Sequence, residues 1–260
     1  MQSHWLVFTD LDGTLLDHDS YDFSPALPAI DRLKRLGIPI IPVSSKTLAE
    51  LDDLVARLHL DGPVIAENGC VIRFPGQQPS ITPPGYTTIR NLLSELRQTT
   101  EFKLTGFGDM NLDEVIAATG LASESARLAR QRLASEPILW EGSKQALSRF
   151  KAKVASKGLR MLQGGRFIHL LGDTDKGRAV RRVIDWYQAA GRRDILSVAL
   201  GDSDNDIDML LEVDIPVIIR KKDGSHLELA QRGTAIITRL AGPAGWNQAL
   251  NNLLNEHGRH

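Results

Sequence analysis

The sequence predicts an α/β protein in which a buried parallel sheet is interrupted by a separate α+β segment. Near both ends of the chain, short apolar runs without polar alternation take turns with amphipathic segments. That order is typical of parallel strands buried on both faces by helices. In the middle of the chain the regular order is lost, and strands and helices follow one another irregularly. The two ends are therefore expected to form one core, and the middle an inserted unit.

The N-terminal part predicts strands and helices in strict alternation. Ser24 is expected to cap the first helix, Gly37 to end it, and Ser45 to cap the second helix. Connections between neighbouring parallel strands should be right-handed crossovers. The predicted strands cover residues 5–9, 39–43 and 64–66, and the predicted helices cover 25–36 and 46–59.

A stretch rich in proline and glycine, residues 73–88, is predicted to be a loop leading into the inserted unit. That unit should contain helices over 89–99, within 112–134 and over 144–157, and strands over 102–106, 138–140, 159–163 and 166–171. The first pattern then returns, with helices over 176–190 and 204–212 and strands over 195–200 and 216–219. We therefore predict a core of residues 1–80 and 172–260 and an inserted domain of residues 81–171.

Composition excludes several classes of function. The 260 residues carry a formal net charge of −1 and no basic block, which argues against nucleic acid as a partner. The single cysteine, Cys70, allows no intrachain disulfide, and no run approaches the roughly 18 apolar residues of a membrane span. We expect a soluble cytoplasmic protein that acts on a small molecule, away from membranes and without an obligate protein partner.

Acidic residues follow two of the predicted strands directly. Asp10 and Asp12 come after the first strand, and Asp202 and Asp206 come after the strand over 195–200. An Asp-x-Asp pair alone is often a solvated turn. However, the carboxyl ends of parallel strands share one edge of a sheet, so all four side chains can converge there. Because crowded carboxylates repel one another and Mg²⁺ prefers oxygen ligands, these four residues predict a magnesium site.

Two further residues suit a phosphate group at the same edge. Ser44 follows the predicted strand over 39–43, where a hydroxyl and free backbone N–H groups can bind an anion. Lys176 opens the helix predicted over 176–190, where its charge opposes the helix dipole. Alone, these would be a helix cap and a surface lysine. Beside the acids, they are better explained as groups that bind phosphate or neutralise crowded carboxylates.

These pieces together resemble the haloacid dehalogenase (HAD) superfamily of phosphohydrolases. The matching motifs are residues 10–14 (DLDGT), Ser44, Lys176 and residues 201–206 (GDSDND). The resemblance implies a Rossmann-like HAD core with a parallel sheet. The insertion resembles the C2B-type cap of the Cof-like branch.

Within that branch the chain most resembles the mannosyl-3-phosphoglycerate phosphatase family. Residues 44–47 (SSKT) replace the Thr-Gly-Arg common in Cof-like sugar phosphatases, and residues 163–169 (QGGRFIH) and 242–246 (GPAGW) resemble segments of that family. The implied reaction is Mg²⁺-dependent dephosphorylation of mannosyl-3-phosphoglycerate to mannosylglycerate through an aspartyl-phosphate.

The resemblance also implies roles for individual residues. Asp10 would be the nucleophile and Asp12 the general acid and base, with Ser44 and Lys176 completing the catalytic set. Asp10 and Asp202 would bind Mg²⁺ through their carboxylates, Asp12 through its backbone carbonyl, and Asp206 directly or through water. Arg166 is the expected partner of a substrate carboxylate, because its planar fork suits bidentate binding. The expected substrate-binding residues are Ser45, Lys46, Glu67, Asn68, Gln163, Gly165, Arg166, His169 and Asn205.

Several alternatives stay open at this point. Another sugar-phosphate phosphatase, acting on sucrose-phosphate or a hexose phosphate, shares the same motifs, as does a phosphomannomutase-like phosphotransferase. A non-catalytic binding module is disfavoured by the intact Asp10 and Asp12. The sequence does not separate mannosyl from glucosyl substrates. Arg166 and His169 can equally serve structural pairing, and Glu67 can equally cap a turn.

Overall fold

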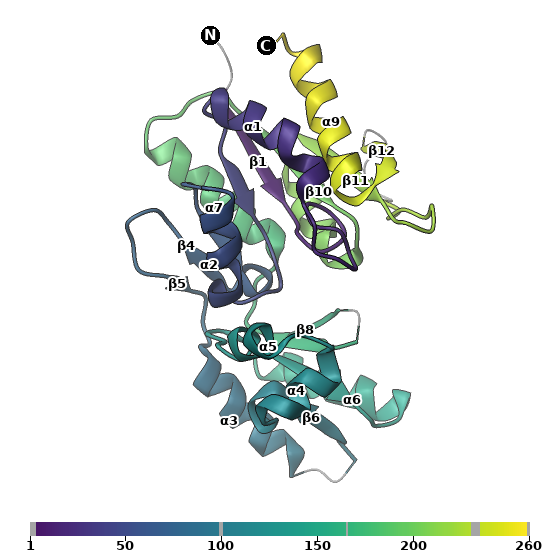
Figure 1. The fold of residues 1–260 in the computed structure, drawn as a ribbon. Helices are drawn as coiled ribbons and strands as arrows, with labels where there is room; N and C mark the ends of the chain where they lie inside the picture. The colour runs from purple at the N-terminus through teal and green to yellow at the C-terminus, as the bar shows by residue number, and fades with distance from the viewer. Residues whose placement is uncertain (1–3, 99–100, 165, 230–234, 259–260) are drawn as a thin grey trace.

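The structure, a computed structural model, describes residues 4–98, 101–164, 166–229 and 235–258. It contains a larger part near both termini and a smaller part built from the middle of the chain, drawn as the upper and lower parts of Figure 1. Each part has its own sheet and its own hydrophobic core. Among the described helices, none is both long and apolar enough to cross a membrane.

The larger part is built on a five-stranded sheet whose strands are all parallel, as the sequence predicts. In spatial order the strands are β12 (Ile236–Ala241), β11 (Ile215–Arg220), β10 (Ile195–Gly201), β1 (His4–Thr9) and β2 (Ile40–Pro42). A parallel bridge from Val43 to Ile65 adds β3 (Val64–Ala66) beside β2. β3 then pairs antiparallel with β4 (Val71–Arg73), which pairs with β5 (Ser80–Ile81).

Helices cover both faces of this sheet, which explains why its strands are apolar without alternation. Trp5 and Val7 of β1 face one core, while Leu6 and Phe8 face the other. The first core is closed by α1 (Leu27–Arg35), α2 (Leu48–Arg57) and α9 (Gly242–Glu256), and the second by α7 (Lys176–Ala189) and α8 (Ile207–Glu212).

Several local predictions were wrong. Thr47, not Ser45, caps α2, because its hydroxyl accepts from Glu50 N–H at 3.2 Å and the Glu50 carboxylate accepts from Thr47 N–H at 2.8 Å. Ser24 lies inside a short 3₁₀ turn, η1 (Ser24–Ala26), rather than capping the helix with its side chain. The predicted loop over residues 73–88 includes β5, and no strand or helix was predicted at β4, β12 or α9.

The smaller part is an antiparallel sheet with helices on both faces. Its strands in spatial order are β6 (Leu104–Gly106), β7 (Ser135–Trp140), β9 (Ile168–Leu171) and β8 (Arg160–Gln163). Through Ile138 one face packs on α3 (Tyr86–Arg97) and α6 (Lys144–Ser156). Through Leu139 the other face contacts the cluster containing α4 (Leu112–Thr119) and α5 (Ser123–Ala129). We call this part the cap; its exact limits, residues 81–171, stay a prediction.

Candidate active site

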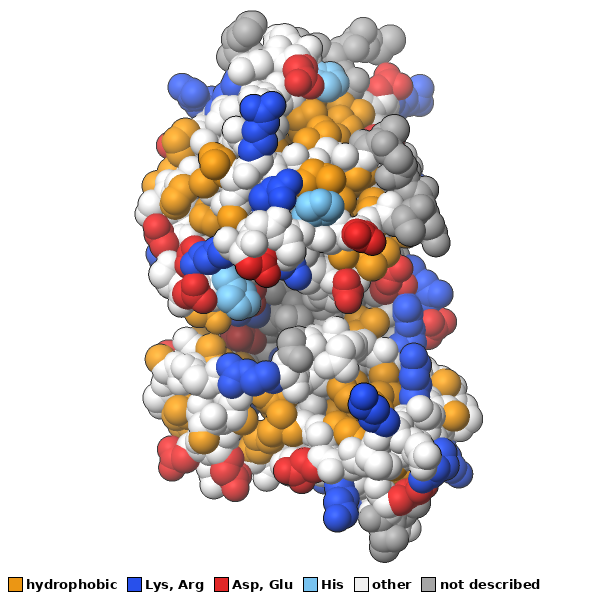
Figure 2. Space-filling model, turned by 90° about the vertical axis from the view of Figure 1, so that its right-hand side faces the viewer, with side chains coloured by type: hydrophobic (Ala, Val, Ile, Leu, Met, Phe, Trp, Pro, Cys, Tyr) orange, Lys and Arg blue, Asp and Glu red, His pale blue; other side chains and the backbone are white. Residues whose placement is uncertain are grey.

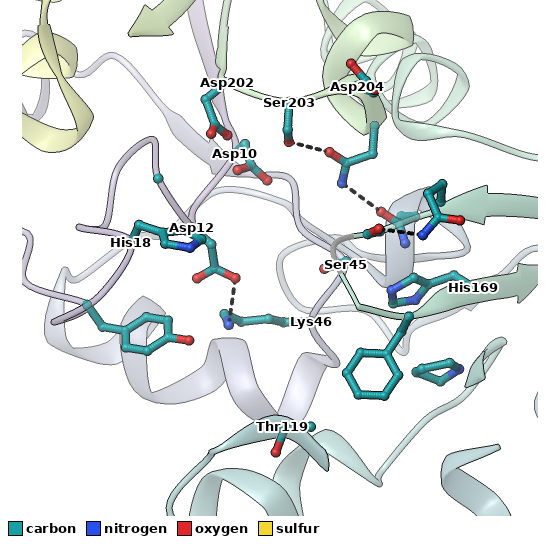
Figure 3. Close-up of a pocket in the computed structure, with 18 of the residues that line it drawn as sticks. Asp10, Asp12, His18, Ser45, Lys46, Thr119, His169, Asp202, Ser203 and Asp204 are labelled. Atoms are coloured by element: carbon teal, nitrogen blue, oxygen red, sulfur yellow. Dashed lines mark hydrogen bonds and ion pairs between the residues drawn. The ribbon is translucent and has the colours of Figure 1, made fainter. Parts of the chain in front are cut away.

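The two predicted acidic motifs meet at the carboxyl edge of the parallel sheet. Thr9 of β1 pairs with Leu200 of β10, and Asp10 N–H donates to the Leu200 carbonyl at 2.9 Å. The chain therefore leaves β1 and β10 at neighbouring points of the same sheet edge, and the two acidic motifs begin there. Oxygens of Asp10, Asp202 and Asp206 lie within 4.8 Å of one another. Figure 3 shows Asp10 and Asp202 adjacent at this edge.

Lys176 supplies a buried positive charge inside this cluster. It is the first residue of α7, whose N-cap Asp175 accepts from Arg178 N–H at 2.8 Å. The Lys176 Nζ atom lies 2.6 Å from Asp10 Oδ1 and 2.6 Å from Asp206 Oδ1. Burial would lower the pKa of Lys176, but the two carboxylates outweigh it and raise that pKa. The side chain is therefore a permanent ammonium ion.

One ammonium does not neutralise three buried carboxylates. Burial, followed by the charge of Asp206, raises the pKa of Asp10 well above its usual value. The same two causes raise the pKa of Asp202 to about 6. The donors are all carboxylate oxygens, the ligand type that Mg²⁺ prefers. The residues present therefore fit a hard divalent cation bound by Asp10, Asp202 and Asp206.

Gly13 lets the chain turn closely around this cluster. Its φ angle is +80°, a left-handed value that favours glycine. A Cβ at Gly13 would also lie only 2.9 Å from Asp202 Oδ2. The next residue, Thr14, places its hydroxyl 3.5 Å from Asp202 Oδ1. The turn after β1 is thus shaped around the Asp202 carboxylate.

The Asp12 carboxylate is separate from the three clustered acids, so a part for Asp12 at the metal through its backbone carbonyl stays a prediction. Its Oδ2 atom lies 2.9 Å from Lys46 Nζ, an ion pair visible in Figure 3. Its Oδ1 atom is buried and has no hydrogen-bond partner among the described residues. Lys46 also lies 5.1 Å from the centre of the Tyr21 ring. Asp12 therefore lines the cavity with one oxygen that no described residue engages.

A cavity of about 940 Å³ lies between the sheet edge and the cap. Figure 2 shows the surface indented between these two parts. The core contributes acidic and basic side chains, including Asp10, Asp12 and Lys46. The cap contributes an apolar wall that includes Phe107, Leu121, Pro137, Leu162 and Phe167, with polar side chains such as Gln163 and His169 beside it. A polar ligand group can thus meet the acids while the rest of the ligand contacts the cap.

Most of the predicted substrate-binding residues line this cavity. They are Ser45, Lys46, Asn68, Gln163, His169 and Asn205. Burial chiefly lowers the pKa of His169 to about 3, with Arg132 and Lys176 adding to the effect. His169 is therefore a neutral imidazole, and its buried Nδ1 atom has no partner among the described residues. Asn205 donates to Asn68 Oδ1 at 3.4 Å and accepts from the Ser203 hydroxyl at 2.7 Å.

The remaining predicted residues are placed differently. Arg166 donates to the carbonyls of Ala118 and Thr119, at 3.0 Å each, and so holds the end of α4 instead of entering the cavity. Ser44 is buried, is absent from the described cavity lining, and accepts from Lys46 N–H at 3.2 Å. Gly165 lies outside the described residues.

Glu67 also does not line the cavity. It is fully buried, and its carboxylate accepts hydrogen bonds from Leu133 N–H, Ala134 N–H and the Ser135 hydroxyl at 2.7–3.1 Å. Both of its oxygens are therefore engaged with the cap, which argues against the predicted contact with substrate.

Sequence reasoning missed Arg132, which lines the cavity from the cap. Its Nη2 atom donates to the Ser45 carbonyl at 2.8 Å. These two residues are 87 positions apart in the chain, and Arg132 belongs to no motif with recognisable spacing. Only the folded arrangement of core and cap reveals the contact.

A parallel sheet, an inserted cap, and paired acids with a lysine at the carboxyl edge define a hydrolase of the haloacid dehalogenase type. The family model for haloacid dehalogenase-like hydrolases matches residues 7–99. A glucosyl-3-phosphoglycerate/mannosyl-3-phosphoglycerate phosphatase of Methanococcoides burtonii is 38% identical, over 97% of this chain and 98% of the relative. One of the same name from Persephonella marina is 36% identical, over 96% and 97%. The chain belongs to the haloacid dehalogenase-like hydrolase family, and it is a phosphatase of that family.

Solved structures agree with this fold. A haloacid dehalogenase-like hydrolase from Bacteroides thetaiotaomicron superposes with a TM-score of 0.71 at 18% identity, covering 96% of this chain and 99% of the other. A HAD subclass IIB sugar phosphatase superposes with a TM-score of 0.68 at 15% identity, covering 98% and 99%. At such low identity the likeness concerns the fold alone.

Proposed function

We propose that the enzyme dephosphorylates mannosyl-3-phosphoglycerate to mannosylglycerate, with Mg²⁺ as its cofactor. The observation that carries this proposal is the end-to-end similarity to two phosphatases named for that substrate and its glucosyl counterpart. The position of Asp10, 2.6 Å from a buried ammonium and open to the cavity, supports a nucleophilic role. The glucosyl substrate is the second candidate because both relatives carry both names.

Asp10, Asp202 and Asp206 would hold the metal ion. When bound, Mg²⁺ supplies positive charge that balances these carboxylates and the phosphoryl oxygens. Asp206 also accepts from the Asp202 and Ser203 N–H groups, at 3.0 and 3.1 Å, so it fixes the position of the Asp202 backbone as well.

The first step forms a covalent intermediate. A carboxylate oxygen of Asp10 attacks phosphorus, and the bond between phosphorus and the glycerate oxygen breaks as the aspartyl-phosphate forms. The leaving oxygen takes a proton from the Asp12 carboxyl group. Lys176 holds Asp10 in place through a 2.6 Å ion pair and offsets the negative charge of the phosphoryl group.

The second step returns the enzyme to its starting state. Asp12, now ionised, accepts a proton from a water molecule as that water attacks phosphorus. The bond between phosphorus and Asp10 breaks, phosphate leaves, and the Asp10 carboxylate is restored. The unpartnered oxygen of Asp12 suits this exchange of protons, because no hydrogen bond from a described residue has to be broken first.

The rest of the substrate would lie against the cap. His169 offers a buried imidazole nitrogen without a described partner, and Gln163 and Asn205 offer amide groups for sugar or glycerate hydroxyls. Since Arg166 is engaged at the end of α4, Lys46 is the better candidate for the substrate carboxylate, because it is a cation that lines the cavity.

A panel of phosphomonoesters tests the proposal. Phosphate release with Mg²⁺ should give a kcat/KM for mannosyl-3-phosphoglycerate at least about 100-fold above that for sucrose-phosphate or hexose phosphates, because those lack the carboxylate. Asp10→Asn should abolish turnover and leave the fold intact. Better turnover of hexose phosphates would refute the substrate. Isomerisation of a labelled hexose 1-phosphate without phosphate release would instead identify a phosphomannomutase-like transferase.

A further inference from the structure

Core and cap are joined by a reciprocal set of buried polar contacts. From the core, Glu67 accepts the N–H groups of Leu133 and Ala134 and the Ser135 hydroxyl, at 2.7, 3.1 and 2.7 Å. From the cap, Arg132 donates to the Ser45 carbonyl at 2.8 Å and lies 3.6 Å from Glu67. Both charged side chains are buried. Each part of the molecule thus contributes one charged group that bonds to the backbone of the other.

The Glu67 carboxylate is fully satisfied by the cap. A buried carboxylate is costly unless it is paired and hydrogen-bonded. Here it has three donors and a nearby guanidinium, and all of them belong to residues 132–135. Displacing the cap would leave this charge without its donors. The contact therefore favours one position of the cap over the core.

The core side of the contact is the pair of loops that carries active-site groups. Glu67 N–H donates to the Lys46 carbonyl at 2.9 Å, and Asn68 N–H donates to the Ser44 carbonyl at 2.9 Å. Lys46 in turn pairs with Asp12. The cap is therefore connected to the residue proposed as general acid and base by hydrogen bonds to Glu67, by the bond from Glu67 N–H to the Lys46 backbone, and by the ion pair of the Lys46 side chain with Asp12.

The backbone at this point is held in an unfavourable conformation. Glu67 and Asn68 have φ angles of +51° and +56°, which non-glycine residues rarely adopt. Such conformations persist where surrounding contacts determine them, and they are concentrated at functional sites. The hydrogen bonds to Ser44, Lys46 and the cap are the contacts that hold this turn.

We propose that Glu67, Arg132 and Ser135 form a cap latch, a set of positioning residues that fixes the cap and the loop of Ser44–Lys46 in register with each other. The cap wall then stands at a set distance from Asp12, and the substrate enters a cavity that is already formed. This inference rests on the proposed function only for the choice of assay substrate.

Glu67→Gln tests the latch, and Glu136→Gln is its matched control. Glu136 is also a fully buried carboxylate with three donors, but these are Tyr86, Arg90 and Gly108, all within the cap. Hydrogen exchange of the full-length protein is followed by mass spectrometry. In Glu67→Gln, peptides covering residues 44–46, 67–70 and 133–135 should exchange at least about tenfold faster than in the wild type. Glu136→Gln should accelerate exchange within the cap only.

Kinetics give the second readout. For Glu67→Gln, the ratio of kcat/KM for the best substrate of the panel to that for p-nitrophenyl phosphate should fall at least about tenfold, because the small ester needs little from the cap wall. Glu136→Gln should keep the wild-type ratio. Using the best panel substrate keeps this outcome independent of which sugar phosphate the enzyme prefers.

Two results would overturn the latch: wild-type exchange and selectivity in Glu67→Gln, or equal acceleration of the core peptides in Glu136→Gln. If Glu67→Gln does not fold, the same two measurements on Arg132→Lys test the cap latch instead. It keeps the charge but loses the guanidinium fork, in which Nη2 donates to the Ser45 carbonyl while Nε donates to the Ser135 hydroxyl. Wild-type behaviour of Arg132→Lys would then reject the proposal.

Discussion

At the scale of single residues, the ionised carboxylate of Asp202 lowers the free energy of unfolding of the metal-free protein. Burial first, and then the charge of Asp206, raises the pKa of Asp202 in the folded protein to about 6, above the 3.8 of an unperturbed aspartate. A carboxyl group with a raised folded pKa stabilises the fold below pH 4 and loses this contribution as pH rises through about 6. The difference of roughly two pKa units corresponds to about 3 kcal/mol.

Asp202→Asn should therefore remove a pH dependence that the wild type shows. With a chelator present, the variant should match the wild type at pH 4 and exceed its free energy of unfolding by up to about 3 kcal/mol at pH 8. Urea unfolding of both proteins across this range measures the difference. If the free energy of unfolding varies with pH in the same way in both proteins, the neighbours of Asp202 do not destabilise its ionised carboxylate. Added Mg²⁺ should raise the melting temperature of the wild type more than that of the variant.

The sequence predicted those site residues that follow strands directly. Asp10 and Asp202 converge because the carboxyl edge of a parallel sheet collects them, whatever their separation in the chain, and Lys176 reaches Asp10 from the first turn of α7. Contacts that depend on how the cap meets the core followed no such rule. Glu67 and Arg166 were expected at the substrate and instead bond to backbone groups of the cap.

At the scale of elements, the 3₁₀ turn η2 (Glu67–Gly69) contacts three parts of the site: the cap, the loop of residues 44–46 and the start of α7. Its third residue, Gly69, has a φ angle of +96°, and a Cβ there would overlap the carbonyl oxygen of Asp175. Asp175 is the N-cap of the helix that begins with Lys176. The turn can therefore approach that helix only because residue 69 lacks a side chain.

Gly69→Ala should lower the free energy of unfolding by about 3 kcal/mol or more, since it adds both backbone strain and a steric clash. It should also reduce turnover, because the clash displaces the start of α7. Gly191→Ala is the matched control: its φ angle is +85°, but nothing lies near the added Cβ. It should cost about 1 kcal/mol and leave turnover unchanged. Equal losses in urea unfolding would contradict the close packing inferred at Gly69.

Elements with strong patterns were predicted well, and those decided by tertiary contacts were not. The apolar run of β1 and the helix over α7 appear where the sequence places them. β12 escaped prediction because it is an edge strand whose Ile236, Ile237 and Leu240 remain substantially exposed, so its pattern resembles neither a buried nor an alternating strand. α2 starts at a different cap because Thr47 and Glu50 form a reciprocal pair that Ser45 cannot form.

At the scale of the whole molecule, the two parts have largely separate cores. The two clusters of the cap contain only residues of the inserted segment, whereas the clusters around the parallel sheet draw few residues from it. The chain enters and leaves the cap at one place, because a Cβ on Gly172 would overlap the carbonyl oxygen of Pro83. The parallel sheet and its helices thus contain nearly all the apolar contacts needed to fold without the cap.

Replacing residues 84–171 by a short glycine-serine linker should therefore leave a folded core. Such a core should unfold cooperatively, and Mg²⁺ should raise its melting temperature, because Asp10, Asp202, Asp206 and Lys176 all remain. It should hydrolyse p-nitrophenyl phosphate but lose its preference for the glycosylated substrate, since the apolar wall and His169 are removed. Circular dichroism during heating and phosphate release measure both outcomes. A core without a cooperative transition would show that the cap is needed for folding, and the predicted division of the chain would be wrong.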